Sequence, residues 1–118
     1  MSASLDRIFT ALANPTRRAI LDRLMAGEAT VNDLTAPFAL SQPTISSHIK
    51  ILENAGLIRR SRQANFRPVQ LDPAALKQVH HWLGTYERFW TESLEQLETY
   101  AKSLEEKDQA GDQDSPQY

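Results

Sequence analysis

Apolar residues recur at helical spacing in the middle of the chain, where Ile45, Ile49 and Leu52 form one narrow apolar face. Ser41 can cap the start of a helix, and the proline two residues later falls in the first turn, where no intrahelical N–H is needed. Gly56 follows at a position where a left-handed residue ends a helix. The pattern predicts a helix between Ser41 and Gly56, with short polar side chains and one lysine on its other face.

Shorter elements flank this helix on both sides. Before it, residues 30–33 form a variant of the capping box, which opens a short helix over residues 31–38. After it, residues 57–62 and 66–71 are strand candidates joined in an arginine-rich hairpin. A short helix, a longer helix and a basic hairpin together make a winged helix-turn-helix, which places its second helix in the major groove of DNA.

The N-terminal part predicts two further helices. The spacing of Leu5, Ile8, Phe9 and Leu12 indicates the first. Asn14 and the proline after it are a cap and a first-position proline, which open the second. The expected core face of this second helix consists of Ile20, Leu21, Leu24 and Met25.

The C-terminal part predicts one long helix. It opens at Asp72 and Pro73, and its apolar residues alternate spacings of three and four up to Leu104, a heptad seam with one stutter. About thirty-three helical residues span roughly 50 Å, which is more than a small domain can cover, so we expect the excess to pack on a second copy of the chain. The expected dimer contacts are Leu5, Ile8, Phe9, Tyr86, Trp90, Leu94, Leu97 and Ala101.

These elements predict a mainly α fold with a small β-hairpin: a winged helix-turn-helix with a long C-terminal dimerisation helix. The 118 residues suit one domain, which we place over residues 1–106, and we expect the polar residues 107–118 to be disordered. No apolar run reaches membrane-spanning length, and the first residues lack the pattern of a signal peptide. We therefore expect a cytoplasmic protein without a membrane partner.

Charge and cysteine content narrow the function. The net charge is −2, but residues 41–72 carry five Lys and Arg against two Asp and Glu, whereas residues 83–118 carry three against nine. A basic face and an acidic far end orient a protein on a polyanion such as DNA. The absence of cysteine excludes disulfides and thiolate metal sites within this chain.

Three separated motifs resemble one family. Residues 11–21, with the sequence ALANPTRRAIL, are similar to the opening signature of ArsR-type winged-helix repressors, and residues 41–46 and 55–58 resemble their recognition helix and its end. Residues 67–71 and the aromatic and leucine positions from Trp82 to Leu97 resemble one subgroup, which lacks metal-binding cysteines. The resemblance covers roughly residues 5 to 105 and implies a small dimeric bacterial repressor.

The residues expected to contact DNA lie on the recognition helix, in the wing and at the start of the second helix. Many relatives carry arginine where this chain has Ser47, so the strongest guanine reader is missing and other contacts gain weight. Adjacent Arg59 and Arg60 face opposite ways on a strand, which favours the arginines that flank the tip of the hairpin. The expected contacts are Gln42, Pro43, Thr44, Ser46, Ser47, Lys50, Arg62, Arg67, Arg17 and Arg18.

Three residues leave two interpretations open. Arg17 and Arg18 can touch a phosphate, because a helix N-terminus attracts anions, or they can pair within the fold. His48 lies at the edge of the apolar face, and we favour a buried, bonded histidine over a base reader.

The sequence offers little support for metal sensing or catalysis. His80 and His81 point about 100° apart on a helix and Glu87 lies about two turns away from His80, so they do not form a ligand set. No nucleophile–base pair, phosphate-binding glycine loop or carboxylate pair is present, so the chain is not expected to be an enzyme or to need a cofactor.

The sequence therefore predicts a homodimer that binds double-stranded DNA at a pseudo-palindromic operator and represses its own or neighbouring genes. One alternative is a repressor that responds to a small molecule in an aromatic pocket formed by Trp82, Tyr86, Phe89 and Trp90, although core and dimer packing explain these residues more simply. Another is a dimeric interaction module that binds no DNA, which a gel shift against the chain's own promoter region would distinguish.

Overall fold

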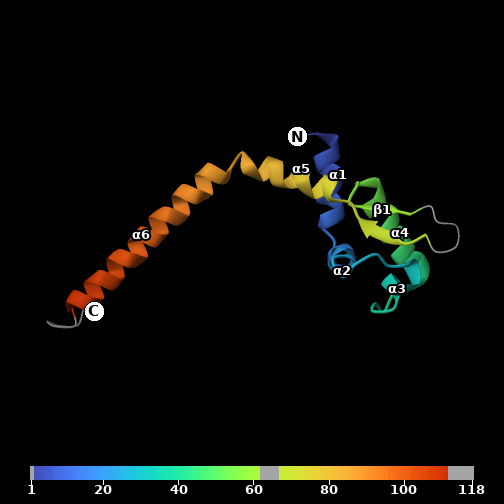
Figure 1. Cartoon of the computed structure of the whole chain (residues 1–118), viewed down its shortest axis with the longest axis horizontal. Coiled ribbons are helices and arrows are strands. Elements are labelled where there is room, and N and C mark those ends of the chain that lie inside the picture. Colours follow the sequence, from blue (N-terminus) through green and yellow to red (C-terminus); the bar gives the residue numbers. More distant parts are fainter. Residues whose placement is uncertain (1, 62–66, 112–118) are drawn as a thin grey trace. The chain divides into compact units, whose positions relative to one another are not determined.

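The structure is a computed structural model that describes residues 2–61 and 67–111 (Figure 1). Its contacts divide the chain into two units, one that ends at His81 and one that begins at Trp82. The sequence predicts a single domain up to residue 106, and the division between residues 81 and 82 falls inside that predicted domain.

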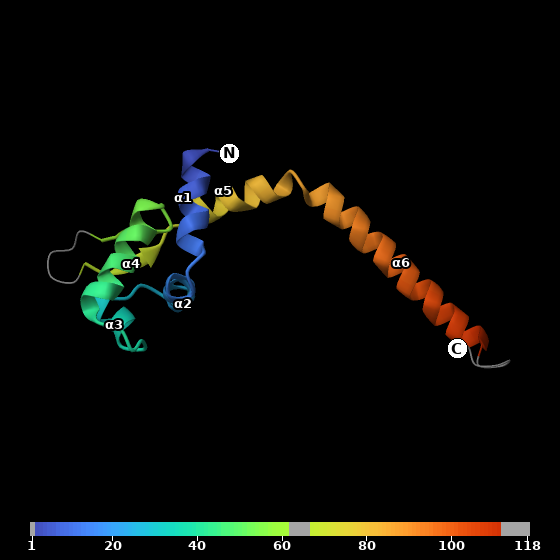
Figure 2. The same cartoon turned by 180° about the vertical axis from the view of Figure 1, so that it is seen from behind.

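The described elements are mostly helices with one small hairpin, in agreement with the predicted fold class (Figures 1 and 2). In chain order they are α1 (Ala3–Leu12), α2 (Pro15–Leu24), α3 (Val31–Thr35), α4 (Gln42–Asn54), β1 (Ile58–Arg60), β2 (Val69–Leu71), α5 (Pro73–Gly84) and α6 (Glu87–Gly111).

The hairpin is shorter than the sequence predicts. β1 pairs with β2 in antiparallel register, Ile58 opposite Leu71 and Arg60 opposite Val69. Ala29 adds a bridge on the other side of β2, because its N–H donates to the Val69 carbonyl at 3.0 Å and its carbonyl accepts from the Val69 N–H at 2.7 Å. The backbone groups of this small sheet are therefore paired beyond its two strands.

The core of the first unit forms around α4, which packs against α1, α2, α3 and β1. The predicted apolar face of α4 is confirmed, because Ile45, Ile49 and Leu52 are fully buried. Leu34 from α3 and Ile20 from α2 meet them in the same core. The cluster holds α4 by one face and leaves the opposite face to solvent.

The predicted core position of Met25 is wrong. The sequence places it on the core face of the second helix, but its side chain is 75% exposed. The helix ends at Leu24, and Met25 is the cap residue that follows it, although its own backbone is still helical.

Local capping groups start the helices where the sequence predicts. The Asn14 side chain accepts from the Arg17 N–H, and the Ser41 hydroxyl accepts from the Thr44 N–H. Before α3, the Thr30 hydroxyl accepts from the Asp33 N–H at 3.1 Å, and the Asp33 carboxylate accepts from the Thr30 N–H at 3.0 Å. The hydrogen bonds from the Thr30 backbone and side chain lower the pKa of Asp33 below its ordinary value.

Helix ends are set by a different group of residues. Gly56 has a φ of +77°, which confirms its role as the left-handed stop after α4. α3 ends at Thr35 rather than at residue 38, since the proline at position 37 cannot continue a helix.

The long C-terminal helix that the sequence predicts is present as two helices, because the helix breaks between Gly84 and Glu87. The Thr85 N–H and hydroxyl both donate to the Trp82 carbonyl, and the Tyr86 N–H donates to the Leu83 carbonyl. These bonds to residues three back replace the helical bonds to residues four back, and Gly84 disfavours a helix at the same point. The heptad spacing runs through the break but does not prevent it.

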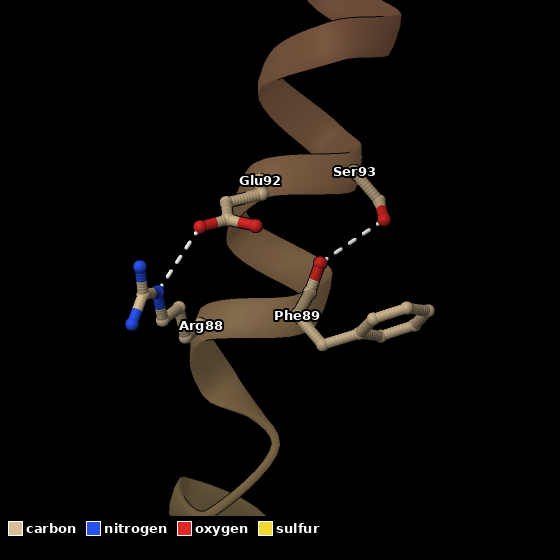
Figure 3. A network of polar contacts seen from close by, with 4 residues as sticks. All are labelled: Arg88, Phe89, Glu92 and Ser93. Atoms are coloured by element: carbon tan, nitrogen blue, oxygen red, sulfur yellow. Dashed lines mark hydrogen bonds and ion pairs between the residues drawn. The ribbon is translucent and has the colours of Figure 1, made fainter.

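The helix α6 extends to Gly111, five residues past the predicted domain end at 106, and residues 112–118 lie outside the described part. Arg88 Nε donates to Glu92 Oε1 at 3.1 Å, and the Ser93 hydroxyl donates to the Phe89 carbonyl at 3.0 Å (Figure 3). The Phe89 ring points outward from the helix, on the side opposite Arg88, and Phe89 is 73% exposed.

An apolar stripe remains exposed along α6. Trp90, Leu94, Leu97, Ala101 and Leu104 repeat at heptad spacing on this helix, and Leu94 and Leu97 are 59% and 63% exposed. Exposed apolar residues gathered in one stripe are typical of an interaction surface. Among the described residues, no helix is both long and apolar enough to cross a membrane.

Candidate nucleic-acid interface

The solvent-facing side of α4 carries the groups that the sequence assigns to DNA contact. Because the buried residues fix the rotation of this helix, the opposite side is polar. Ser46 is half-buried at the edge of this face. The exposed members are Gln42, Pro43, Thr44, Ser47 and Lys50, and Asn54 continues the same face.

Several of these groups have free hydrogen-bonding capacity. Within the described part of the chain, no residue hydrogen-bonds the side chains of Gln42, Ser47 or Lys50. The Thr44 hydroxyl is paired with the Ser41 hydroxyl at 2.9 Å, which holds both at the start of the helix. An amide, a hydroxyl and an ammonium group are thus available to base edges or phosphates.

The base of the wing adds positive charge beside α4. Arg59 is exposed and Arg60 is half-buried, which confirms that adjacent arginines face opposite ways. Arg60 Nε lies 3.7 Å from Glu53 Oε1, so an ion pair joins the wing to the recognition helix. With Arg67, these side chains line a hollow of about 670 Å³.

Arg67 is exposed and has a φ of +38°, a left-handed conformation that residues other than glycine rarely adopt. Such local strain is often found in segments that present a side chain for function. Arg62, the other predicted wing contact, lies outside the described residues.

Arg17 and Arg18 have partners inside the fold. Arg17 donates to three acceptors: Nε to the Ala11 carbonyl at 2.8 Å, Nη2 to the Thr10 carbonyl at 3.1 Å, and Nη1 to His48 Nδ1 at 3.2 Å. Arg18 Nη1 donates to the Leu12 carbonyl at 2.7 Å. Both guanidinium groups thereby satisfy carbonyls at the C-terminal end of α1, where positive charge is favourable.

His48 is half-buried and bonded rather than fully buried. Its burial, and secondly the positive charge of Arg17, lower the pKa of its imidazole below the ordinary value. A neutral ring with the proton on Nε2 leaves Nδ1 free to accept from Arg17.

Sequence reasoning missed Glu53 and Asn54. Glu53 anchors Arg60, a contact between residues seven apart that no local pattern signals. Asn54 is exposed and lies one helical turn after Lys50, so its place on the polar face follows from spacing alone.

The predicted dimer contacts divide into two groups. The predicted dimer contact by Ile8 is wrong, because Ile8 is fully buried in the core of its own chain. Its side chain therefore has no surface left for a second copy. Leu5 is also buried and Phe9 is half-buried. The remaining residues are exposed: Tyr86, Trp90, Leu94, Leu97 and Ala101.

The aromatic and histidine candidates lie on α5, on α6 and, for Tyr86, in the break between these helices. Trp82 and Tyr86 make an edge-to-face contact with ring centroids 5.3 Å apart. Among the described residues, no three His, Asp or Glu side chains come close enough to hold a metal ion.

The fold and this site define a winged helix-turn-helix DNA-binding protein. A sequence profile described as "Bacterial regulatory protein, arsR family" matches residues 14–60. The chain is 40% identical over 91 residues to the HTH-type transcriptional regulator Rv2034 of Mycobacterium tuberculosis, covering 77% of this chain and 82% of that protein. It is 35% identical over 79 residues to the transcriptional repressor SdpR of Bacillus subtilis, covering 67% and 88%. The chain belongs to the ArsR family of transcriptional regulators.

Solved structures agree with this assignment. The crystal structure of the ArsR family transcriptional regulator RHA00566 has 40% sequence identity and a TM-score of 0.68, covering 75% of this chain and 91% of that one. The homodimeric winged helix-turn-helix DNA-binding domain Mb0332 of Mycobacterium bovis has 25% identity and a TM-score of 0.56, covering 75% and 80%. The chain is thus a transcriptional regulator, a class without enzymatic activity.

Proposed function

We propose that this regulator is a homodimeric repressor that binds a pseudo-palindromic operator, in control of its own or neighbouring genes. The observation that carries the proposal is the exposed polar face of α4, where Gln42 lines one hollow together with Arg60 and Arg67 at the base of the wing. Such a face suits the major groove, and the flanking arginines suit the phosphates on either side. A bacterial regulator of this kind acts where the chromosome lies, in the cytoplasm.

The residues divide into two roles in this proposal. Gln42, Ser46 and Ser47 meet base edges, because amide and hydroxyl groups can donate to and accept from them. Lys50 and Arg67 neutralise phosphates, since both are exposed cations. Arg62, which with Arg67 flanks the tip of the predicted wing, is the other wing contact in this proposal.

Dimerisation is supported by the apolar stripe of α6 and by the homodimeric state of the Mycobacterium bovis relative. A second copy of the same stripe is the natural cover for leucines that are more than half exposed. A two-fold dimer would hold two recognition helices about one DNA turn apart, roughly 34 Å, and so require an operator with two-fold symmetry.

The assigned DNA face can be tested with Lys50→Ala combined with Arg67→Ala. Each lost phosphate contact lowers the slope of log affinity against log salt by about one unit, and the two substitutions remove four contacts from a dimer, so we expect a slope smaller by about four and weaker binding. Fluorescence anisotropy with the promoter region of the chain's own gene at several salt concentrations measures both. Lys77→Ala with Lys102→Ala removes the same charge from α5 and α6 and serves as the control. An unchanged slope in the first variant would remove Lys50 and Arg67 from the interface.

A further inference from the structure

Arg17 stands where three helices meet. Its guanidinium bonds the last carbonyls of α1, its backbone belongs to the first turn of α2, and its third bond reaches His48 in the middle of α4. His48 is 31 positions away in the chain, so this is a tertiary contact. α4 also packs against both α1 and α2, which makes the contact part of a larger interface.

The geometry of the group makes the contact stiff. A guanidinium is planar and presents its N–H groups in fixed directions, so two bonds to carbonyls of α1 also fix the direction of the third. His48 directly follows Ser47 and precedes Lys50 by two residues. A shift or rotation of α4 at His48 would therefore displace the DNA-facing side chains as well.

We propose that Arg17 is a positioning residue for DNA recognition, which holds α4 in register through His48, and that protonation of His48 releases this hold and weakens operator binding. The inference rests on the proposed DNA-binding face. It assigns Arg17 a role in placing the recognition helix instead of a role in binding a phosphate.

The chemistry gives the pH dependence a definite sign. Nδ1 accepts from Arg17 only while it is unprotonated, and a protonated ring would turn an N–H and a positive charge toward the guanidinium. Burial and the Arg17 charge lower the pKa of His48 from 6.5, so the neutral ring is favoured in the folded chain. The contribution of the bond is therefore fully present above pH 6.5 and is lost as the pH falls through the lowered pKa.

The other charged groups on the elements that pack against α4 have neighbours other than the His48 ring. Asp6 and Arg7 of α1 line a hollow with Ile51, one turn further along α4. Asp33 of α3 is bonded to Thr30, and Arg60 of β1 is paired with Glu53. On α2, Arg17 is in direct contact with the His48 ring.

A direct DNA contact by His48 would give the opposite sign. Phosphates favour a protonated histidine, so binding through the ring itself would strengthen as the pH falls. The direction of the pH effect thus distinguishes a positioning role from a phosphate contact.

The test measures affinity for the chain's own promoter fragment at pH 7.5 and pH 5.5 for three forms. Asparagine places an acceptor oxygen where histidine has Nδ1 but does not titrate, so His48→Asn should bind like wild type at pH 7.5 and change little with pH. Wild type should bind more weakly than His48→Asn at pH 5.5, by up to roughly tenfold, which is the scale of one hydrogen bond to a charged group. His48→Leu, which offers no acceptor, should bind weakly at both pH values. The double variant His80→Asn and His81→Asn should keep the wild-type pH effect.

A second arm separates position from charge. Arg17→Lys keeps the positive charge but loses the forked donors, so we expect weaker binding with an unchanged salt slope. If Arg17 instead contacts a phosphate, Arg17→Lys should bind almost normally and Arg17→Gln should lower the slope by about two, one unit for each protomer of the dimer. Far-UV circular dichroism confirms folding of each variant, and the His48 series decides the matter if the Arg17 variants unfold.

Several outcomes would overturn the inference. Binding that strengthens at pH 5.5, or a His48→Leu variant with wild-type affinity, would exclude the positioning role. If the wild-type chain still binds the fragment at pH 7.5, that result leaves the proposed DNA-binding face in place. Wild type that fails to bind any promoter fragment at pH 7.5 would instead contradict the proposed function itself.

Discussion

The double variant Leu94→Glu with Leu97→Glu is expected to be monomeric and to lose at least about a hundredfold in operator affinity. Both leucines are more than half exposed on α6. Burying a leucine on association contributes roughly 1.5–3 kcal/mol, and in a symmetric dimer each substitution acts twice. Four carboxylates near a two-fold axis would also repel one another. Sedimentation velocity at micromolar concentration measures the state of assembly, and anisotropy measures the affinity.

The opposite side of the same helix provides a matched control. Gln96→Glu with Thr99→Glu adds the same charge to α6, but at positions that face away from the apolar stripe. We expect this variant to remain dimeric and to bind close to normally. A wild-type chain that sediments as a monomer, or a leucine variant that still dimerises and binds as wild type, would contradict the proposed dimer surface.

Ile49→Ala should lower the free energy of unfolding by about 2–5 kcal/mol. The side chain is fully buried in the core that holds α4, and truncation leaves a cavity there. A small domain has only about 5–15 kcal/mol in total, so this one change removes a large share of the stability. Urea unfolding followed by far-UV circular dichroism gives the change.

Ile51→Ala is the control for that experiment, because Ile51 lies on the same helix and is 40% exposed. The two variants remove the same atoms and place the same residue in the same helix, so helix propensity cancels between them. We expect the Ile51 variant to cost about 1 kcal/mol or less. Equal losses in the two variants would mean that α4 does not bury the face described above.

Features governed by neighbouring residues were accessible from the sequence. Asn14, Ser41 and the Thr30–Asp33 pair cap helices through contacts within three residues, and the structure confirms each. The rotation of α4 was also predictable, since the spacing of three buried residues fixes which groups face outward.

Features that depend on competing or distant contacts were not accessible. The break after Gly84 could not be predicted from the sequence pattern, because the heptad spacing continues through it. Local hydrogen bonds of Thr85 end the helix there. Spacing marks Ile8 as apolar but does not say whether it faces its own core or a second copy. The choice between the two interpretations of Arg17 depends on His48, which only the folded chain brings near.

Selection of bound fragments from a random DNA library, followed by sequencing, tests the central claim most directly. A two-fold dimer with one recognition helix per chain should enrich an inverted repeat whose half-site centres lie about 10 base pairs, or one turn, apart. Because arginine is missing at Ser47, we expect the half-sites to tolerate substitution more than a guanine-reading site would. Enrichment of a single, unrepeated half-site, or of no sequence at all, would contradict the account of a dimeric repressor that reads a symmetric operator.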